Sequence, residues 1–253
     1  MEKNTISYKS FEKSPIRSLK HNTYFHVYDK IFSGYRDKDI TFVEVGIAAG
    51  GSLFMWRDFF GPNARIIGIE FNPEAKVLEK EGFEIFIGNQ SDQFFWKDFY
   101  SKVGPIDILL DDGGHTYIQQ IVTIESSIKN INNGGVIVTE DVHTSYLSGF
   151  GVRNLSLINY AKKKIDDINL RFSKFKDHGE RDIFSLEFYE SIVVFNIDRK
   201  ICSIESKPMV NTNNSLHTAT DFRYKDIKIR IKFIKDLIHN LKSYLVLRKF
   251  FKK

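Results

Sequence analysis

Acidic residues and histidines follow two short apolar segments, 106–110 and 136–139. The side chains concerned are Asp111, Asp112, His115, Glu140, Asp141 and His143. Apolar runs of this length, bounded by turn residues, are typical of buried strands in a parallel sheet. Ligands of such sheets bind beyond the carboxyl ends of the strands, so we expect these side chains to meet at one edge. Clustered carboxylates repel one another unless a cation lies among them, which indicates a site for Mg²⁺, Mn²⁺ or Ca²⁺.

A glycine-rich loop, residues 46–52, links an expected strand at 41–45 to an expected helix at 53–60. A strand, a glycine turn and the start of a helix together form a ready site for anions and nucleotides. The dinucleotide fingerprint Gly-x-Gly-x-x-Gly needs a second glycine where Ala48 stands, so that fingerprint is incomplete. The loop also fits an ordinary tight turn, and by itself it favours a ligand site only mildly.

A further acid, Glu70, ends the expected strand 65–70 and follows Gly50 by 20 residues. An acid at this position of a nucleotide-binding sheet binds the ribose hydroxyls. The segment 88–92, Gly-Asn-Gln-Ser-Asp, follows the next strand and could contact a base or simply cap the following helix. Acids then stand at three strand ends, and explaining them all as separate helix caps requires three coincidences.

Strands and helices alternate along the chain, which predicts an α/β fold with a mostly parallel sheet. Expected strands cover 41–45, 65–70, 84–87, 106–110 and 136–139, and expected helices cover 22–35, 53–60, 77–80, 93–100, 116–131 and 152–168. A C-terminal β-hairpin is expected from segments 188–197 and 200–206, turning near Asp198 and Arg199. Residues 1–20 lack periodicity and are interpreted as a loose arm. We expect an N-terminal arm and helix at 1–38, a main domain at 39–207, and a linker and tail at 208–253.

The positive charge is concentrated in the tail. The chain has 253 residues and a net charge of +5. Residues 223–253 hold eleven Lys and Arg against two Asp, which gives +9 there and leaves −4 for the rest. The acidic main domain therefore argues against nucleic acid as a partner. The single cysteine, Cys202, excludes an internal disulfide and fits a reducing cytoplasm.

Apolar residues in the tail recur at helical spacing, with lysines on the other faces. They are Ile227, Ile231, Ile234, Ile238, Leu241 and Leu245. Such a basic amphipathic helix either docks on protein, its own domain or a partner subunit, or attaches to an anionic membrane surface. We weigh these two interpretations equally. Residues 1–24 contain no apolar core of a secretory signal, and no stretch of the chain is long and apolar enough to span a bilayer.

The glycine loop, with Glu44 two residues before Gly46, resembles motif I of class I S-adenosylmethionine-dependent methyltransferases. Together, the segments 45–52, 111–115 and 140–146 resemble those of the metal-dependent sugar O-methyltransferases of the macrocin and mycinamicin type. Relatives of these enzymes methylate sugars of bacterial surface polysaccharides. The resemblance covers roughly residues 22–206. It implies a Rossmann-like fold with a mostly parallel seven-stranded sheet, to which this chain adds an N-terminal helical arm and a basic C-terminal helix.

The resemblance also assigns roles to individual residues. It assigns the following residues to binding of the cofactor, which is S-adenosylmethionine: Glu44, Gly46, Gly50, Ser52, Glu70, Asn89, Gln90 and Asp111. In this assignment Glu70 holds the ribose, and Asn89 and Gln90 lie near the adenine. The methionine part of the cofactor is lined by Glu44, Gly46, Gly50 and Ser52. Asp112, Glu140 and Asp141 hold the divalent cation, with Mg²⁺ expected first and Mn²⁺ or Ca²⁺ as alternatives. His115 is the general base, His143 and Tyr146 face the substrate, and Tyr24 and His26 close over the cofactor.

The function implied by the resemblance is metal-assisted methylation of a sugar hydroxyl. The first expectation for the acceptor is a nucleotide-linked hexose or heptose for capsule or another surface polysaccharide. We expect a cytoplasmic enzyme. Contact with the inner face of the membrane through residues 223–253 and a homo-oligomeric state are both left open.

Two other functions remain open at this point. Tyr160 and Lys164, with Ser148 upstream, match the Tyr-x-x-x-Lys pattern of NAD-dependent sugar-nucleotide oxidoreductases. Lysine is abundant in this chain, so the match is weak. The other function is that of a non-catalytic, membrane-associated scaffold with a methyltransferase fold. Methylation of nucleic-acid amino groups is disfavoured because the chain contains no Pro-Pro pair.

Overall fold

The computed structural model describes residues 2–172, 181–207, 209–211 and 240. The chain divides into two units, residues 1–207 and 208–253, and nearly all described residues belong to the first. The amphipathic tail helix expected at 223–253 therefore lies outside the described residues, apart from Asn240. Within the described part, no helix combines the length and the apolar character needed to cross a bilayer.

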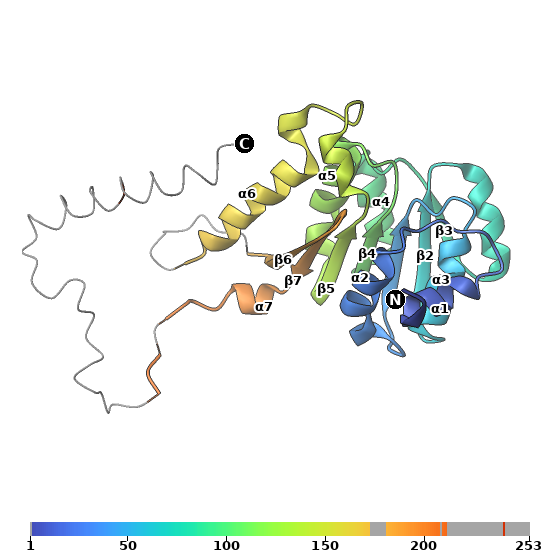
Figure 1. The fold of residues 1–253 in the computed structure, drawn as a ribbon, viewed down its shortest axis with the longest axis horizontal. Helices are drawn as coiled ribbons and strands as arrows, with labels where there is room; N and C mark the ends of the chain where they lie inside the picture. The colour runs from blue at the N-terminus through green and yellow to red at the C-terminus, as the bar shows by residue number, and fades with distance from the viewer. Residues whose placement is uncertain (1, 173–180, 208, 212–239, 241–253) are drawn as a thin grey trace, which may run out of the picture. The chain divides into compact units, whose positions relative to one another are not determined.

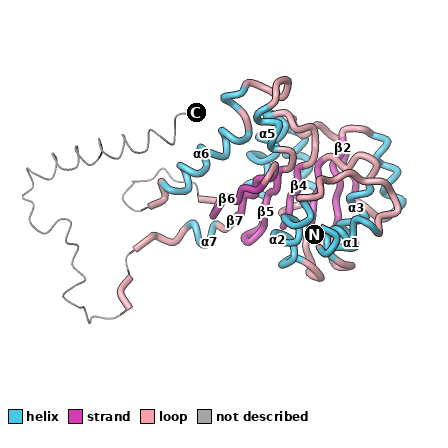
Figure 2. The backbone as a smooth tube through the Cα atoms, in the orientation of Figure 1, coloured by secondary structure: helices cyan, strands magenta, loops and turns pink. Residues whose placement is uncertain are grey.

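A seven-stranded sheet forms the centre of the first unit, with helices on both sides (Figure 2). Its strands, in chain order, are β1 Thr41–Val45, β2 Arg65–Glu70, β3 Glu84–Ile87, β4 Ile106–Asp111, β5 Ile131–Thr139, β6 Ile183–Tyr189 and β7 Ile192–Ile197. The order in space is β3-β2-β1-β4-β5-β7-β6, as Figure 1 shows. Strands β1 to β5 pair in parallel, whereas β7 is antiparallel to both β5 and β6. The predicted fold class, a mostly parallel seven-stranded sheet with a C-terminal hairpin, is confirmed.

Helices cover both faces of the sheet (Figure 1). On one face lie α1 Ile6–Glu12, α2 Tyr24–Phe32 and α3 Gly51–Phe60, and on the other α4 Gln93–Val103, α5 Tyr117–Ser127 and α6 Leu157–Asn169. Alternate side chains of each strand enter the two cores, so that Phe42 packs with the first group and Val43 with the second. The short helices are α7 Arg199–Cys202 and the 3₁₀ turns η1 Glu2–Asn4, η2 Ser33–Tyr35, η3 Pro73–Glu81, η4 Ile128–Asn130, η5 Val142–Tyr146 and η6 Arg153–Leu155.

Aromatic rings anchor helix α2 to the sheet. The Trp56 ring lies 5.0 Å from that of Tyr28, 5.4 Å from Phe32 and 5.1 Å from Phe42, measured between centroids. All four side chains are fully buried. Because rings of this size bury large apolar areas, the cluster holds α2 rigidly against β1 and α3. Helix α2 therefore presents its tyrosines at a fixed position beside the strand ends.

The N-terminal arm is more ordered than its sequence predicts. Residues 6–12 form helix α1, although the arm was expected to be loose. The first two amides of α1, those of Ile6 and Ser7, donate to the Asp29 carboxylate at 2.7 and 2.8 Å. This acceptor comes from α2, so local periodicity cannot reveal it. The expectation of a loose arm was wrong for this segment.

The C-terminal hairpin lies earlier in the chain than expected. It turns at Glu190 and Ser191, between β6 and β7, and not near Asp198 and Arg199. The Asp198 side chain instead accepts the amide of Ile201 at 3.0 Å and caps helix α7. An aspartate serves in turns and helix caps alike, which explains the misplaced turn.

Candidate functional site

The glycine loop and the loop after β4 pack backbone against backbone. Gly46 has a φ of 82°, and a Cβ atom there would lie 2.2 Å from the carbonyl oxygen of Asp112. The Asp112 amide donates to the Val45 carbonyl at 3.0 Å, which fixes the two loops together. Only glycine fits this position, because any side chain would separate the loops. The two segments chosen from the sequence thus form one structural unit.

A cavity of about 620 Å³ opens at the carboxyl ends of β1 to β4. Five predicted site residues line it: Gly46, Glu70, Asn89, Gln90 and Asp112. The volume lies within the range of cofactor pockets in proteins. The structure thus brings the predicted nucleotide-binding positions around a single space.

The Glu70 carboxylate is fixed at the wall of this cavity by backbone amides. It accepts hydrogen bonds from the amides of Ala48 at 3.0 Å, Phe71 at 2.9 Å and Asn72 at 3.2 Å. The bond from Ala48 ties the end of β2 to the glycine loop. A carboxylate held in this way has one defined orientation, as recognition of a hydroxyl pair requires.

Two predicted cofactor residues, Asp111 and Gln90, are buried and form hydrogen bonds within the protein, although Gln90 also lines the cavity. Asp111 is 1% exposed, and its Oδ1 accepts the Gln90 side-chain amide at 2.9 Å. Burial raises the pKa of Asp111 to about 6, although the bonds from Gln90 and the Gly113 amide lower it. Gln90 is 6% exposed, and its carbonyl oxygen accepts the Gly114 amide at 2.8 Å. Both side chains brace the loop that carries Asp112.

A second cavity, of about 340 Å³, lies between the glycine loop and the segment that precedes helix α2. Residues 17–20 line it together with Gly46, Ser52 and Asp112. Glu44 does not reach this space, because it is fully buried behind Ser52, whose hydroxyl donates to it at 2.6 Å. The segment before α2 therefore covers the glycine loop, where the methionine part of the cofactor was expected.

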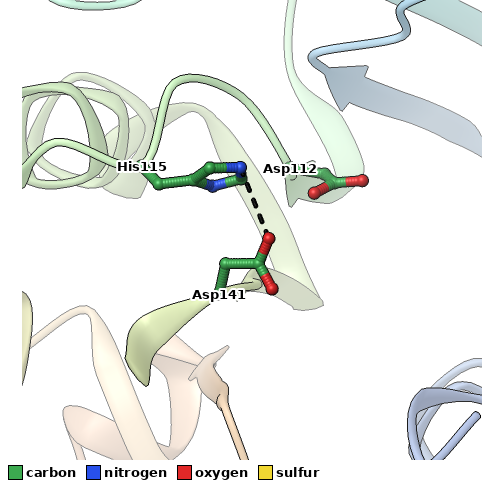
Figure 3. Close-up of side chains that lie close together, drawn as sticks. All are labelled: Asp112, His115 and Asp141. Carbon is green, nitrogen blue, oxygen red and sulfur yellow. Dashed lines mark ion pairs between the residues drawn. The ribbon is translucent and has the colours of Figure 1, made fainter. Parts of the chain in front are cut away.

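Asp112, His115 and Asp141 converge at the ends of β4 and β5 (Figure 3). One possible ligand atom from each lies within 4.8 Å of the other two. His115 Nε2 is 3.3 Å from Asp141 Oδ2, and the side chains are between 20% and 26% exposed. Two carboxylates and an imidazole at this spacing can hold a divalent cation.

The backbone at this cluster is unusual. His115 and Asp141 have φ angles of 59° and 54°, and Ala48 in the glycine loop has 46°. Residues other than glycine seldom adopt such angles, and the strain is retained where the surrounding structure enforces it. The fold thus holds these side chains in orientations that unstrained turns would not provide.

Polar groups from His21, α2 and η5 surround Asp141. The Tyr24 hydroxyl donates to Asp141 Oδ1 at 2.7 Å. Burial, followed by the interaction with Asp141, raises the pKa of Tyr24, so its phenol remains a donor. His21 Nε2 and His143 Nδ1 lie 3.8 and 3.9 Å from the same oxygen. The predicted involvement of Tyr24 is therefore with a carboxylate of the cluster, whereas His26 is exposed on the same helix.

The neighbouring acid, Glu140, points in another direction. It is 1% exposed, and its Oε1 accepts the Tyr28 hydroxyl at 2.5 Å. Its Oε2 lies 3.2 Å from the ammonium group of Lys20, a side chain that is 2% exposed. Lys20 also contacts Asp112 at 2.7 Å and Glu44 at 3.3 Å. Both oxygens of Glu140 thus have protein partners, and its role as a cation ligand stays a prediction.

Lys20 carries its positive charge in this environment. Burial alone would lower its pKa, but the carboxylates of Asp112 and Glu140 raise it well above the ordinary value. Sequence reasoning missed Lys20, one of several lysines in an aperiodic arm, and it assigned no site role to Tyr28. No local pattern marks either residue, because their partners lie far away in the chain.

The oxidoreductase pattern does not lie at this site. The Tyr160 hydroxyl donates to Glu125 at 2.6 Å, and Lys164 pairs with the same carboxylate at 3.3 Å. Neither side chain lines the 620 Å³ cavity. The predicted substrate residues His143 and Tyr146 are on η5, with Tyr146 65% exposed.

Comparisons with known proteins identify the kind of fold that this chain has. Residues 43–142 match a family model described as a methyltransferase domain. We call residues 43–142 the methyltransferase domain, and the chain has the Rossmann-like fold of class I methyltransferases. Its predicted resemblance to the sugar O-methyltransferases is confirmed by the proteins that this methyltransferase domain matches.

Two curated relatives have 32% sequence identity to this chain over the aligned residues. One is the 8-demethyl-8-alpha-L-rhamnosyl tetracenomycin-C 2′-O-methyltransferase of Streptomyces olivaceus, matched over 51% of this chain and 35% of its own length. The other is the mycinamicin VI 2″-O-methyltransferase of Micromonospora griseorubida, matched over 49% and 32%. The chain thus spans about a third of the length of these relatives.

The fold is similar to that of the MycE methyltransferase from the mycinamycin biosynthetic pathway. A crystal structure of MycE in complex with Mg, SAH and mycinamycin VI superposes with a TM-score of 0.69 and 25% sequence identity. The match covers 83% of this chain and 56% of MycE. Most of this chain therefore shares the fold of the matched part of MycE.

Proposed function

We propose that this protein is an S-adenosylmethionine-dependent O-methyltransferase that methylates a sugar hydroxyl with the help of a divalent cation. The observation that carries this proposal is the convergence of Asp112, His115 and Asp141 beside the 620 Å³ cavity. MycE forms a complex with Mg, SAH and mycinamycin VI, which supports the same chemistry here.

The residues around the cavity fit S-adenosylmethionine. Glu70, oriented by three amides, would bind the ribose, and Asn89 with the backbone of Gln90 would lie at the adenine. The 340 Å³ cavity beside Gly46, Ser52 and Asp112 would leave space for the methionine part. The bound sulfonium supplies an activated methyl group, and the protein's task is to align it with the acceptor oxygen.

The donor set at the strand ends fits a hard divalent cation such as Mg²⁺. Asp112 and Asp141 supply carboxylate oxygens, and the Tyr24 hydroxyl fixes the orientation of Asp141. Glu140 would join them only by giving up contacts with Tyr28 or Lys20. When bound, a cation in this position lowers the pKa of a coordinated hydroxyl and orients it.

His115 provides the proton acceptor in this proposal. Its side chain is 26% exposed, so an acceptor entering from solvent can reach the imidazole. Proton transfer to a positioned histidine accelerates such reactions by about 10²–10⁴-fold. Asp141 Oδ2, 3.3 Å from Nε2, stabilises the imidazolium that forms. The pair therefore removes the hydroxyl proton as the oxygen attacks the methyl group.

The acceptor is proposed to be a nucleotide-linked hexose or heptose of a surface polysaccharide, methylated in the cytoplasm. Two relatives are named as O-methyltransferases of rhamnosyl tetracenomycin-C and of mycinamicin VI, which supports a sugar hydroxyl as the target. His143 and Tyr146, exposed on η5 beside Asp141, would contact this sugar.

A screen of nucleotide sugars and glycosides for release of S-adenosylhomocysteine (SAH), the product of methyl transfer from S-adenosylmethionine, tests the proposal. We expect release with at least one sugar, loss of release in excess EDTA and recovery with Mg²⁺. Asp112→Asn should lose the response to Mg²⁺. The matched control Asp98→Asn, which removes an exposed carboxylate paired with Lys102, should keep it. Full activity in EDTA would contradict the metal role, and binding of NAD in place of SAH would contradict the assignment.

A further inference from the structure

Lys20 places a positive charge among three acids that come from three strand ends. Its ammonium nitrogen lies 2.7 Å from Asp112, 3.2 Å from Glu140 and 3.3 Å from Glu44. The Lys20 side chain is 2% exposed, and Glu44 and Glu140 are 0% and 1% exposed. Buried carboxylates at this density require a neutralising cation, and in this arrangement the lysine provides it.

The ammonium group binds the same oxygens that a divalent cation would use. Sequence resemblance assigns both Asp112 and Glu140 to the metal, yet Lys20 contacts one oxygen of each. The other oxygen of Glu140 accepts the Tyr28 hydroxyl. Two cations at these oxygens would repel each other strongly at such short range. The lysine and the divalent ion therefore exclude each other from the space between Asp112 and Glu140.

We propose that Lys20 is a built-in competitor of the divalent cation. In this scheme, a cation ligated by Asp112 and Glu140 displaces the ammonium group and lifts the segment 13–20, here called the strap. The inference rests on the proposed metal-assisted function and adds a control on access to the same site. Residues 17–20 of the strap line the 340 Å³ cavity beside Gly46 and Ser52. Metal binding would thereby open the methionine side of the cofactor site.

Apart from Lys20, the strap is attached by Ile16, which is partly buried against the core, and by a few polar contacts. It contains no helix or strand, and its Lys13 forms an exposed ion pair with Asp58. The Ser14 hydroxyl donates to the Gly51 carbonyl at 2.8 Å. Surface ion pairs contribute little to stability, so the buried contacts of Lys20 are the main electrostatic attachment of the strap. Removing them is therefore expected to free the strap.

Direct measurement of Mn²⁺ binding tests the competition without an acceptor sugar. The full-length protein is titrated with Mn²⁺, and the free ion is followed by electron paramagnetic resonance. We expect Lys20→Met to lower the dissociation constant at least ten-fold, because a competing charge is lost from the site. Lys20→Arg, which keeps the charge, and the strap control Lys13→Met should both stay within about two-fold of wild type. An unchanged or weaker affinity in Lys20→Met overturns the inference.

Trypsin supplies a test on the wild-type protein, which decides the question if Lys20→Met does not fold. Cleavage after Lys20 needs an accessible side chain, and this one is 2% exposed. Adding Mg²⁺ should accelerate cleavage after Lys20 at least five-fold relative to cleavage after the exposed Lys102. No acceleration, or protection, overturns the inference.

Failure of the inference can be told apart from failure of the proposed function. Equal Mn²⁺ affinity in wild type and Lys20→Met would contradict only the proposed competition between Lys20 and the divalent cation. If neither protein binds Mn²⁺ and SAH release persists in EDTA, the metal-assisted function falls as well. Binding of Mn²⁺ by Lys20→Met alone would show the lysine excluding the ion completely.

Discussion

Substituting Gly51 by alanine is expected to separate the strap from helix α3. Gly51 is the first residue of α3, and a Cβ atom there would lie 2.4 Å from the Ile16 carbonyl oxygen and 2.6 Å from that of Arg17. Both atoms belong to the strap backbone, which cannot rotate away as a side chain could. The φ angle of Gly51 is not positive, so alanine itself fits the helix.

The size of the effect follows from two opposing contributions. Carbon–oxygen contacts are comfortable near about 3.3 Å, so the strap would have to move by roughly 0.9 Å. Overpacking of this kind costs about 1–3 kcal/mol. Alanine is a better helix former than glycine, which offsets up to about 1 kcal/mol. We therefore expect a net loss of about 1–2 kcal/mol, equivalent to a fall in Tm of roughly 2–8 °C in a chain of this size.

Thermal unfolding and SAH titration calorimetry measure the two consequences. Gly51→Ala should lower Tm and weaken SAH binding, because residues 17–20 line the 340 Å³ cavity in which we propose that the methionine part binds. Gly34→Ala is the matched control, since nothing lies within 4 Å of a Cβ atom there. A Tm equal to or above that of wild type, together with unchanged SAH affinity, would refute the packing of the strap on α3.

Three other substitutions test separate parts of the structure. His115→Ala should bind SAH normally but lose turnover by about 10²–10⁴-fold, and normal turnover would remove the general-base role. Tyr28→Phe deletes the hydrogen bond to Glu140 and should lower the free energy of unfolding by about 1.5–3 kcal/mol, as denaturant titration will show. Asp182→Asn should cost about 1.5–3 kcal/mol at pH 7, since Asp182 pairs with Lys129 and Arg199. Burial would raise the pKa of Asp182, but these partners lower it below the ordinary value of 3.8. The difference in stability between the variant and wild type should therefore vanish as the pH falls through the folded-state pKa of Asp182.

The strand ends were predictable because their pattern is local. Apolar runs that end at acids, namely Glu70, the pair Asp111 and Asp112, and the pair Glu140 and Asp141, predict both the parallel strands and the edge where they end. The glycine loop was identified for the same reason, since Gly46 sits where two loops must touch. The hairpin was misplaced because Asp198 has the composition of a turn but caps a helix.

The environment of each acid was not predictable from the sequence. Glu140 and Asp141 are neighbours in the chain, yet one faces Tyr28 and Lys20 in the interior and the other faces His115. The left-handed backbone at Asp141, with φ of 54°, separates their directions. Such an angle in a non-glycine residue leaves no local sequence signal. The order of the arm likewise depends on Asp29, a partner supplied by another helix.

The central claim is that the strand-end acids hold a divalent cation directly beside the methyl donor. Nuclear magnetic resonance of S-adenosylmethionine carrying a ¹³C-labelled methyl group tests it without an acceptor. In the bound state, replacing Mg²⁺ by paramagnetic Mn²⁺ should broaden the methyl resonance severely in the wild type and leave it sharp in Asp112→Asn. A methyl signal that stays sharp in the wild type at saturating Mn²⁺ would contradict the claim.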